Sequence, residues 1–408
     1  MKSRTSLFCR VLLLILLFPI IGEICGQNKI LNYSLPDSYS KDSLLEQHLP
    51  IEEQWWKNFH DYRLDSLIHI AMQNNWNLLM AQQRVIQARA SMRSAYGAFF
   101  PSLSLSAGWN RGRTSQNMTS TTLSNDPYSS YYSATASMSW EIDVFGNIRE
   151  NARAQKELYK ASRADYAAMM VSIAASIGTA YIELRTTQRL IDVMINNIAS
   201  QQEVVRITEA RYKAGLSSLL DVTQAKSTYY NTKASIAAYE THQSQSINTL
   251  ALLTGLLPSV IEPVLFEKVD FPKVNRLVPV SIPAGLLRQR PDIRAAEYQV
   301  SSQSAALGAA RSEWFPTFFV NGEIGVASNK LDRLFEKPSM IWQIAPVMKW
   351  TIFNGGQRVA AIASAKAALQ SSVDNYNLTV LTALQEVENA ISSYKNSFKE
   401  TMEYRSAP

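Results

Sequence analysis

Cysteine is almost absent from this sequence, and both copies lie near the N-terminus. Cys9 and Cys25 are in or next to an apolar run at residues 11–21, which follows three basic residues. This pattern is typical of a secretory signal peptide and is too short for a membrane helix. We therefore assign residues 1–25 to a signal peptide. The mature chain then keeps at most one cysteine, which argues against internal disulfides and thiolate metal sites.

Two interpretations of Cys25 stay open at this point. One is a lipid-modified N-terminus of the mature chain, and the other is ordinary signal cleavage at residues 25–27. The preceding residues Gly22-Glu23-Ile24 lack the small residue that is expected just before an acylated cysteine. Cys25 is therefore a candidate for lipid attachment, and the sequence does not decide between acylation and ordinary cleavage.

Histidine and charge are also scarce, and both absences bear on function. The four histidines match no metal-ligand spacing and are scattered at His48, His60, His69 and His242. Charged residues make up 18% of the chain, below the soluble average of about 25%. The net charge of +6 is spread along the chain without the concentrated basic face that nucleic-acid binding needs. No catalytic constellation or phosphate-binding glycine loop is present, so we expect no enzyme, metal site or cofactor.

Proline is missing from residues 147–257, although it occurs on either side at Pro127 and Pro258. Strong helix formers dominate the segment. One helix over residues 147–214 would reach roughly 100 Å at about 1.5 Å per residue. Charged residues recur along it, which argues against a membrane-spanning helix and favours a very long packed one.

Glycine interrupts this helical run at the point where we expect the chain to reverse. Gly215 suits a left-handed C-cap, and Ser217 or Ser218 suits the N-cap of a following helix. We predict a long antiparallel helical hairpin that turns at Gly215 and ends near Thr254. A further helix is expected over residues 64–98, where apolar residues keep helical spacing.

Elsewhere the hydrophobic period changes from helical to two. Residues 102–144 and 317–353 each hold two apolar/polar alternating runs around a polar loop, which predicts two β-hairpins. Pro346 is awkward in the last strand because it lacks a ladder donor. A soluble sandwich has the same alternation, but the secretory context and the small-polar face favour a membrane β-barrel. The predicted lipid-facing positions are Leu105, Trp109, Ala136, Met138, Trp140, Ile324 and Trp350.

The order helix, two strands, helix occurs twice along the chain, which indicates an internal duplication. A shift of 215 residues brings Phe100-Pro101 onto Phe315-Pro316. After the signal peptide we therefore divide the chain into an extended segment, a first repeat, a proline-rich linker and a second repeat, at residues 26–63, 64–256, 257–283 and 284–408.

Four strands per chain are too few for a closed membrane barrel, which needs about eight or more. The barrel must therefore be shared between chains. Three chains would give twelve strands, and their long helices could ring one axis as a continuous tube. Dimers and odd-numbered barrels stay open on these grounds.

Several strings in the chain are similar to one family of membrane proteins. From about residue 55 to the end, the chain resembles outer-membrane efflux proteins of the TolC/OprM type, which are the exit ducts of tripartite drug pumps. The two most specific strings are Trp140-Glu-Ile-Asp-Val-Phe-Gly146 and Arg290-Pro-Asp-Ile-Arg-Ala-Ala-Glu297. The others are Trp55-Trp56-Lys-Asn-Phe59, residues 64–75, Ala180-Tyr-Ile-Glu-Leu184, Tyr212-Lys-Ala-Gly215 with Leu220-Asp-Val222, and Trp350-Thr-Ile-Phe-Asn-Gly-Gly356.

The resemblance implies a mixed α and β membrane protein. It would be a homotrimer whose outer-membrane β-barrel continues as a long periplasmic α-helical barrel. Its partners would be a periplasmic adaptor protein, an inner-membrane efflux pump and outer-membrane lipid, with no nucleic acid. The tip of the tube, where an adaptor docks and the channel closes, matches Tyr212, Gly215, Leu216, Leu220 and Asp221. The family pattern also includes a last long helix beyond residue 405, which this sequence does not contain.

The structural rival is a periplasmic coiled-coil scaffold that bridges the envelope. A scaffold explains the long helices, but it does not explain four alternating strands with aromatic residues near their ends. The expected function is therefore an outer-membrane exit duct that passes drugs or other small molecules.

Overall fold

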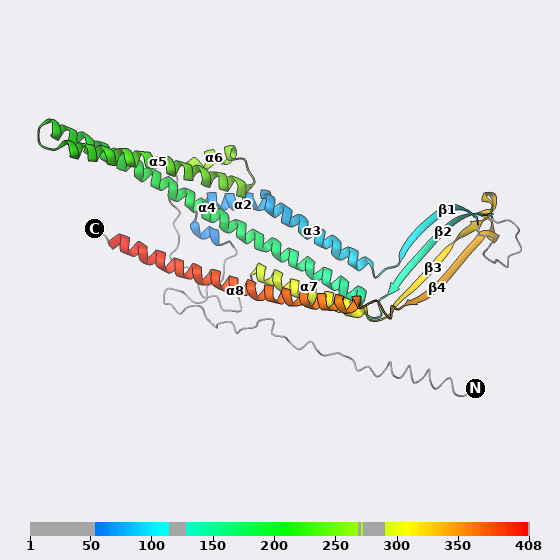
Figure 1. The fold of residues 1–408 in the computed structure, drawn as a ribbon. Coiled ribbons are helices and arrows are strands. Elements are labelled where there is room, and N and C mark those ends of the chain that lie inside the picture. Colours follow the sequence, from blue (N-terminus) through cyan, green and yellow to red (C-terminus); the bar gives the residue numbers. More distant parts are fainter. Residues whose placement is uncertain (1–53, 114–127, 268–270, 272–289, 407–408) are drawn as a thin grey trace.

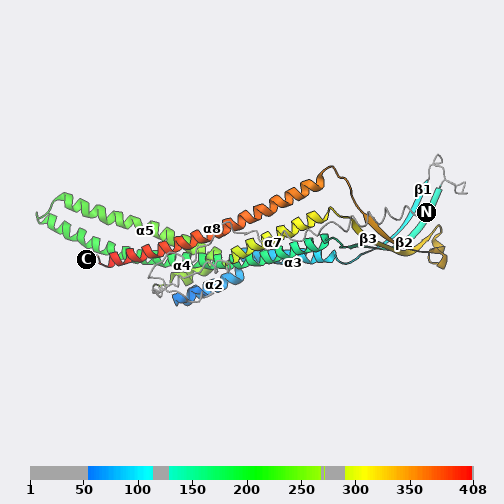
Figure 2. The same ribbon diagram turned by 90° about the horizontal axis from the view of Figure 1, so that it is seen from below.

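The chain forms an elongated molecule with a β-sheet at one end and a helical hairpin at the other (Figure 1). The computed structural model describes residues 54–113, 128–267, 271 and 290–406. The predicted signal peptide, Cys25, most of the N-terminal extended segment and most of the linker therefore lie outside the described residues. Viewed from below, the sheet and the hairpin turn still lie at opposite ends (Figure 2).

Helices precede and follow each pair of strands. The first part of the chain holds a 3-10 helix η1 and then α2, α3, β1, β2, α4, α5 and α6, at Trp55–Phe59, Tyr62–Asn74, Trp76–Gly97, Ser102–Arg113, Tyr128–Ile142, Asn147–Lys213, Leu219–Thr254 and Pro258–Phe266. The second part holds α7, β3, two short 3-10 helices η3 and η4, β4 and α8, at Pro291–Ser312, Thr317–Ser328, Leu331–Arg333, Lys337–Ser339, Met340–Lys349 and Gln357–Ser406.

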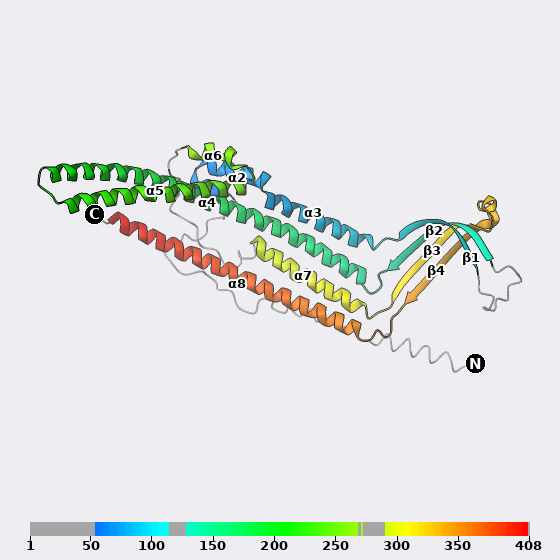
Figure 3. The same ribbon diagram turned by 45° about the horizontal axis from the view of Figure 1, so that its top comes forward.

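Four helices lie side by side in the order α3, α4, α7, α8, and each has one end at the sheet (Figure 3). Each connects to one strand, and the strands follow the same spatial order, β1-β2-β3-β4. All three strand pairs are antiparallel. The pairing of β2 with β3 joins the two predicted hairpins into one sheet. Pro346 lies opposite Val320 in the register of β3 with β4, and β4 is the last strand of the sheet within one chain.

The predicted long hairpin is confirmed as α4 and α5, with α4 unbroken over 67 residues. One part of the sequence argument was too strong. By length and composition, α4 contains an 18-residue stretch with a mean hydropathy of 1.5 that could cross a membrane. In the structure α4 packs against α2, α3, α5 and α7, so its small apolar residues serve helix packing.

The single helix expected over residues 64–98 is wrong, because it divides into α2 and α3 at Asn75. The Asn75 side chain accepts hydrogen bonds from the amides of Asn77 and Leu78 and so caps α3. Its own amide group donates to the carbonyl of Leu253 at 2.7 Å. The apolar period continues across the break, and for that reason the sequence pattern did not reveal it.

The linker predicted at residues 257–283 also needs correction, because it begins with helix α6. Pro258 stands at the first helical position, where its missing N–H costs nothing. Ile261 and Leu265 are buried and hold this helix on the body of the molecule. The described part of this segment is therefore mostly helical.

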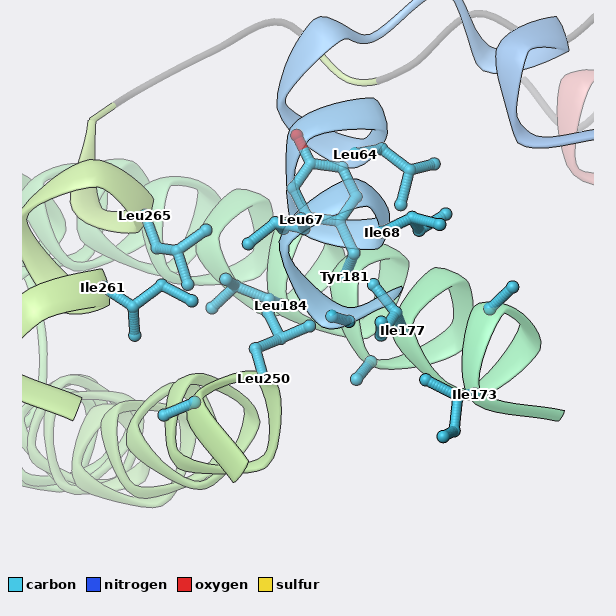
Figure 4. Close-up of a cluster of buried hydrophobic side chains, with 14 of the residues drawn as sticks. Leu64, Leu67, Ile68, Ile173, Ile177, Tyr181, Leu184, Leu250, Ile261 and Leu265 are labelled. Carbon is cyan, nitrogen blue, oxygen red and sulfur yellow. The ribbon is translucent and has the colours of Figure 1, made fainter. Parts of the chain in front are cut away.

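The main hydrophobic core lies where α2, α4, α5 and α6 meet (Figure 4). Tyr181 of α4 is fully buried there, close to Leu64 of α2 and Leu184 of its own helix. Its hydroxyl donates to the carboxylate of Asp61, which also caps α2. Burial raises the pKa of Tyr181 to about 12, so the phenol stays protonated and remains a donor at neutral pH.

Candidate functional site

The turn at the far end of the hairpin is built by a glycine in the left-handed region. Gly215 has φ +77°, a conformation in which a side chain would be strained. The amide of Leu216 donates to the carbonyl of Arg211 at 2.8 Å, and the amide of Gly215 donates to that of Tyr212 at 2.9 Å. These two bonds form the Schellman motif that ends a helix. The predicted reversal at Gly215 is thus confirmed.

Asp221 lies in the first turn of the return helix α5 and forms a capping box with Ser218. The Asp221 amide donates to the Ser218 hydroxyl at 3.2 Å, and the Asp221 carboxylate accepts from the Ser218 amide at 2.9 Å. The hydrogen bonds from the backbone and hydroxyl of Ser218 lower the pKa of Asp221 below its ordinary value. Its carboxylate is therefore ionised at neutral pH and exposed at the tip of the hairpin.

Several exposed apolar side chains lie close to Asp221 in the sequence, in the turn and at the start of α5. The side chains of Leu216, Leu219 and Leu220 are 70%, 60% and 71% exposed. Tyr212 is also exposed. Leu219 was not among the predicted tip residues, although the Leu219-Leu220 pair directly after the cap was a signal for it. We call Tyr212, Leu216, Leu219, Leu220 and Asp221 the tip surface.

The sheet has one apolar face, as the alternation predicted. Residues paired across antiparallel strands point to the same side, and the register places Leu105, Ala136, Ile324 and Trp342 in one row. Leu105 and Trp342 are 82% and 70% exposed. The neighbouring rows on this face contain the other predicted strand positions, Trp109, Met138 and Trp140.

Trp350 differs from that expectation, because β4 ends at Lys349 and Trp350 follows the strand. Its indole N–H donates to the carbonyl of Trp314 at 3.1 Å. Trp140 makes the equivalent bond to the carbonyl of Phe99 at 2.9 Å. Each bond ties the turn from helix into strand to the end of the neighbouring strand. The sequence analysis did not predict either bond.

The opposite face of the sheet is polar and hollowed around Glu323, and nearer the ends of β3 and β4 it also carries Phe319, Ile341 and Val347. A concave space of about 390 Å³ is lined by four serines, by Asn321, Glu323 and Gln343, and by Met138, Gly322 and Ala345. Hydroxyls bond across the strands, for example Ser106 with Thr135 at 2.9 Å and Ser139 with Asn321 at 2.9 Å. A polar surface of small residues such as this one suits the lining of an aqueous passage.

Two buried arginines hold the end of α6, a feature that sequence reasoning missed. Arg185 donates to the carbonyls of Leu265 and Glu267, and Arg63 forms an ion pair with the Glu267 carboxylate at 2.6 Å. The Arg185 guanidinium also lies 4.9 Å from the centre of the Tyr181 ring. The partners are far apart in the sequence, so no local pattern could connect them. Among the described residues, no group of three histidines, cysteines or carboxylates is placed to bind a metal.

The matches to known proteins agree with this architecture. The family model described as outer membrane efflux protein matches residues 67–256 and 282–401. The solvent efflux pump outer membrane protein SrpC of Pseudomonas putida is 32% identical over 343 residues, which are 82% of this chain and 70% of that protein. The probable outer membrane lipoprotein SilC of Salmonella typhimurium is 28% identical over 363 residues, covering 87% of this chain and 75% of that protein.

Solved structures give the same result for the fold. The outer-membrane channel OprN superposes with a TM-score of 0.84 at 28% identity, over 91% of this chain and 84% of that one. The long hairpin and the four-stranded sheet are thus arranged as in a known channel. The chain belongs to the outer membrane efflux protein family.

Proposed function

We propose that three copies of this chain close into one duct, with a twelve-stranded barrel followed by a tube of long helices. The chain is an outer-membrane component of an efflux system and serves as its exit duct. The observation that carries the trimer is the open sheet. Its four strands leave β1 and β4 each with one partner in the chain, whereas closed membrane barrels have about eight strands or more.

The two faces of the sheet fit this assembly. Hydrocarbon cannot satisfy exposed polar groups, so the apolar face with Leu105 and Ile324 would lie against outer-membrane lipid. The hydroxyl-rich face would line the lumen. The internal duplication explains how one chain supplies two hairpins, and its two repeats are the units that we propose for residues 64–256 and 284–408.

The partners of the duct follow from its two ends. With the sheet in the outer membrane, a helix as long as α4 carries the tip surface roughly 100 Å into the periplasm at about 1.5 Å per residue. We propose that a periplasmic adaptor protein binds the tip surface and links the duct to an inner-membrane pump. The exposed leucines offer apolar contact, and Asp221 offers a charge that selects the partner.

Cys25 supplies the proposed lipid anchor. The name of the relative SilC includes the word lipoprotein, and this favours acylation over ordinary cleavage for Cys25 as well. Mass spectrometry of the mature N-terminus tests the assignment. A lipidated cysteine is expected, whereas a peptide that starts at residue 26 or 27 would show that the barrel alone holds the protein in the membrane.

The trimer is tested by gel electrophoresis of outer-membrane fractions, with and without heating. A barrel shared by three chains should run as a trimer in mild detergent without heating and as a 45.7 kDa chain, less its signal peptide, after boiling. Migration as a monomer under both conditions, or recovery only from the soluble periplasmic fraction, would favour a periplasmic scaffold instead.

A further inference from the structure

Glu323 is the one charged residue in the middle of the polar face of the described sheet. The register aligns it with Ser137 on β2 and Gln343 on β4, and with Ser104 beyond Ser137. Both immediate neighbours are uncharged. Glu323 also lines the concave space on this face, so its carboxylate borders the hollow side of the sheet.

The other charges on this face lie far along the strands. Glu141 is four positions from Ser137 on β2, and Lys349 is six positions from Gln343 on β4. At about 3.3 Å per residue these offsets are roughly 13 and 20 Å. Both exceed the screening length of about 8 Å at physiological salt. Among the described strand residues on this face, no compensating charge therefore lies within screening range of the Glu323 carboxylate.

We infer that Glu323 makes the barrel lumen selective for cations and for positively charged cargo. The inference rests on the proposed shared barrel, in which three copies of Glu323 lie at one level. Twelve strands spaced by about 4.8 Å and tilted by about 40° enclose a cylinder roughly 24 Å across. The Glu323 side chains point inward from this wall, so each carboxylate lies closer to the axis than the backbone radius of roughly 12 Å and acts on an ion that passes it.

The expected effect is on ion preference rather than on assembly. A lumen lined by one sign of charge concentrates ions of the other sign. Removing the charge from Glu323 leaves the neutral serine and glutamine neighbours and a near-isosteric side chain. The strand pairing and the apolar face stay as they were.

The test is the reversal potential of purified trimers in planar bilayers under a potassium chloride gradient. Glu323→Gln should lower the permeability ratio of potassium to chloride by about two- to tenfold, and Glu323→Lys should lower it further. Gln343→Glu adds a charge opposite Glu323 and should raise the ratio. Equal ratios in all four proteins would overturn the inference.

Two single-cysteine variants, modified by charged thiol reagents, test the position of Glu323 separately. Glu323→Cys, modified by a negatively charged methanethiosulfonate reagent added from the extracellular side, should regain the cation preference. A positively charged reagent should lower it again. Ile324→Cys is the matched control, because its side chain lies on the opposite face and should not react from the aqueous side. The parent protein, treated with the same reagents, controls for any reaction at Cys25.

The two levels of argument fail differently. A parent protein that forms no channel overturns the proposed duct, and this inference with it. A conducting parent whose ion preference is unchanged by Glu323→Gln, or whose Ile324→Cys variant reacts as readily as Glu323→Cys, overturns the lumen role of Glu323 alone.

Discussion

Single residues decide where the long helices of this chain end. Gly215 and Gly255 both have positive φ, at +77° and +72°, but their surroundings differ. Nothing lies within 4 Å of a Cβ placed on Gly215, whereas one placed on Gly255 would be 2.4 Å from the Asn74 carbonyl oxygen. Gly215 is needed for its backbone conformation alone. Gly255 is also needed for the close approach of α5 to the end of α2.

This difference predicts unequal costs of substitution. Gly255→Ala should destabilise the fold by about 1–2 kcal/mol through the left-handed backbone alone, and further through the clash with Asn74. Gly215→Ala should show only the backbone cost. Gly97→Ala is the control, because a Cβ there meets nothing within 4 Å and helix propensity favours it.

The measurement is thermal loss of helical circular dichroism in detergent. The midpoint should fall in the order Gly97→Ala, Gly215→Ala, Gly255→Ala. A Gly255→Ala variant as stable as Gly215→Ala would mean that α2 and α5 can separate without cost at this contact.

Sequence reasoning located features that depend on neighbours in the chain and missed those that depend on neighbours in space. Gly215 and the cap after it are local, and the turn was predicted correctly. The break at Asn75 was missed because the apolar period continues across it, and the bond from its side chain to the Leu253 carbonyl, far along the chain, was not predictable either. Asp143 falls inside the hairpin range predicted to end at residue 144, but β2 ends at Ile142, and the Asp143 carboxylate accepts from the amides of Ile148 and Arg149 at the start of α4.

At the scale of whole elements, the sheet was the most predictable part of the fold. A period of two fixes which residues share a face, and the register places Leu105, Ala136 and Ile324 on one face. The order of the strands was not available from any period. The β2–β3 pairing joins elements that are far apart in the sequence, and only the structure supplies it.

The facing of β2 predicts a sharp contrast between two adjacent positions. Met138 lies on the apolar face and Ser139 on the polar face. Met138→Arg should cost about 2–4 kcal/mol if the residue lies near the midplane, where lipid cannot solvate the charge. Ser139→Arg should cost much less. Equal tolerance in a folding assay from urea into lipid vesicles would argue against the lipid-facing assignment.

The two tryptophan bonds make a prediction for the junction between helices and sheet. Trp140→Phe and Trp350→Phe keep an aromatic ring but remove the N–H donors to Phe99 and Trp314. A hydrogen bond of this kind contributes about 0.5–1.5 kcal/mol net, so each variant should unfold at lower denaturant concentration.

The double variant should lose the sum of the two effects, because the bonds lie at different strand pairs and share no partner. Trp76→Phe serves as the control, since this tryptophan is exposed outside the core and away from the strands. A loss in Trp76→Phe as large as in the other two would mean that the measured effect is not due to the bonds.

The whole molecule places the sheet and the tip surface at opposite ends (Figure 1), so one duct would have two places where charge can act on its contents. At the tip, Asp221 has two roles that the sequence could not separate. It caps the return helix through Ser218, and three copies around the proposed axis would form an acidic constriction.

The capping box gives these roles different pH and mutational signatures. Since the pKa of Asp221 is lowered in the folded chain, its stabilising contribution is present above the ordinary value of 3.8 and is lost as pH falls through the folded value. Ser218→Ala breaks the box and leaves the carboxylate, whereas Asp221→Ala removes both.

We therefore expect Asp221→Ala to raise resting conductance or to lower cation preference in planar bilayers, while trimers still form. Ser218→Ala, which keeps the negative charge at the constriction, should leave ion preference unchanged. If the two variants behave alike, Asp221 acts only through the start of the helix. If Asp221→Ala changes ion preference and Ser218→Ala does not, the carboxylate itself acts on the ions at the tip of the duct. The two variants differ in that Ser218→Ala keeps the negative charge and Asp221→Ala removes it.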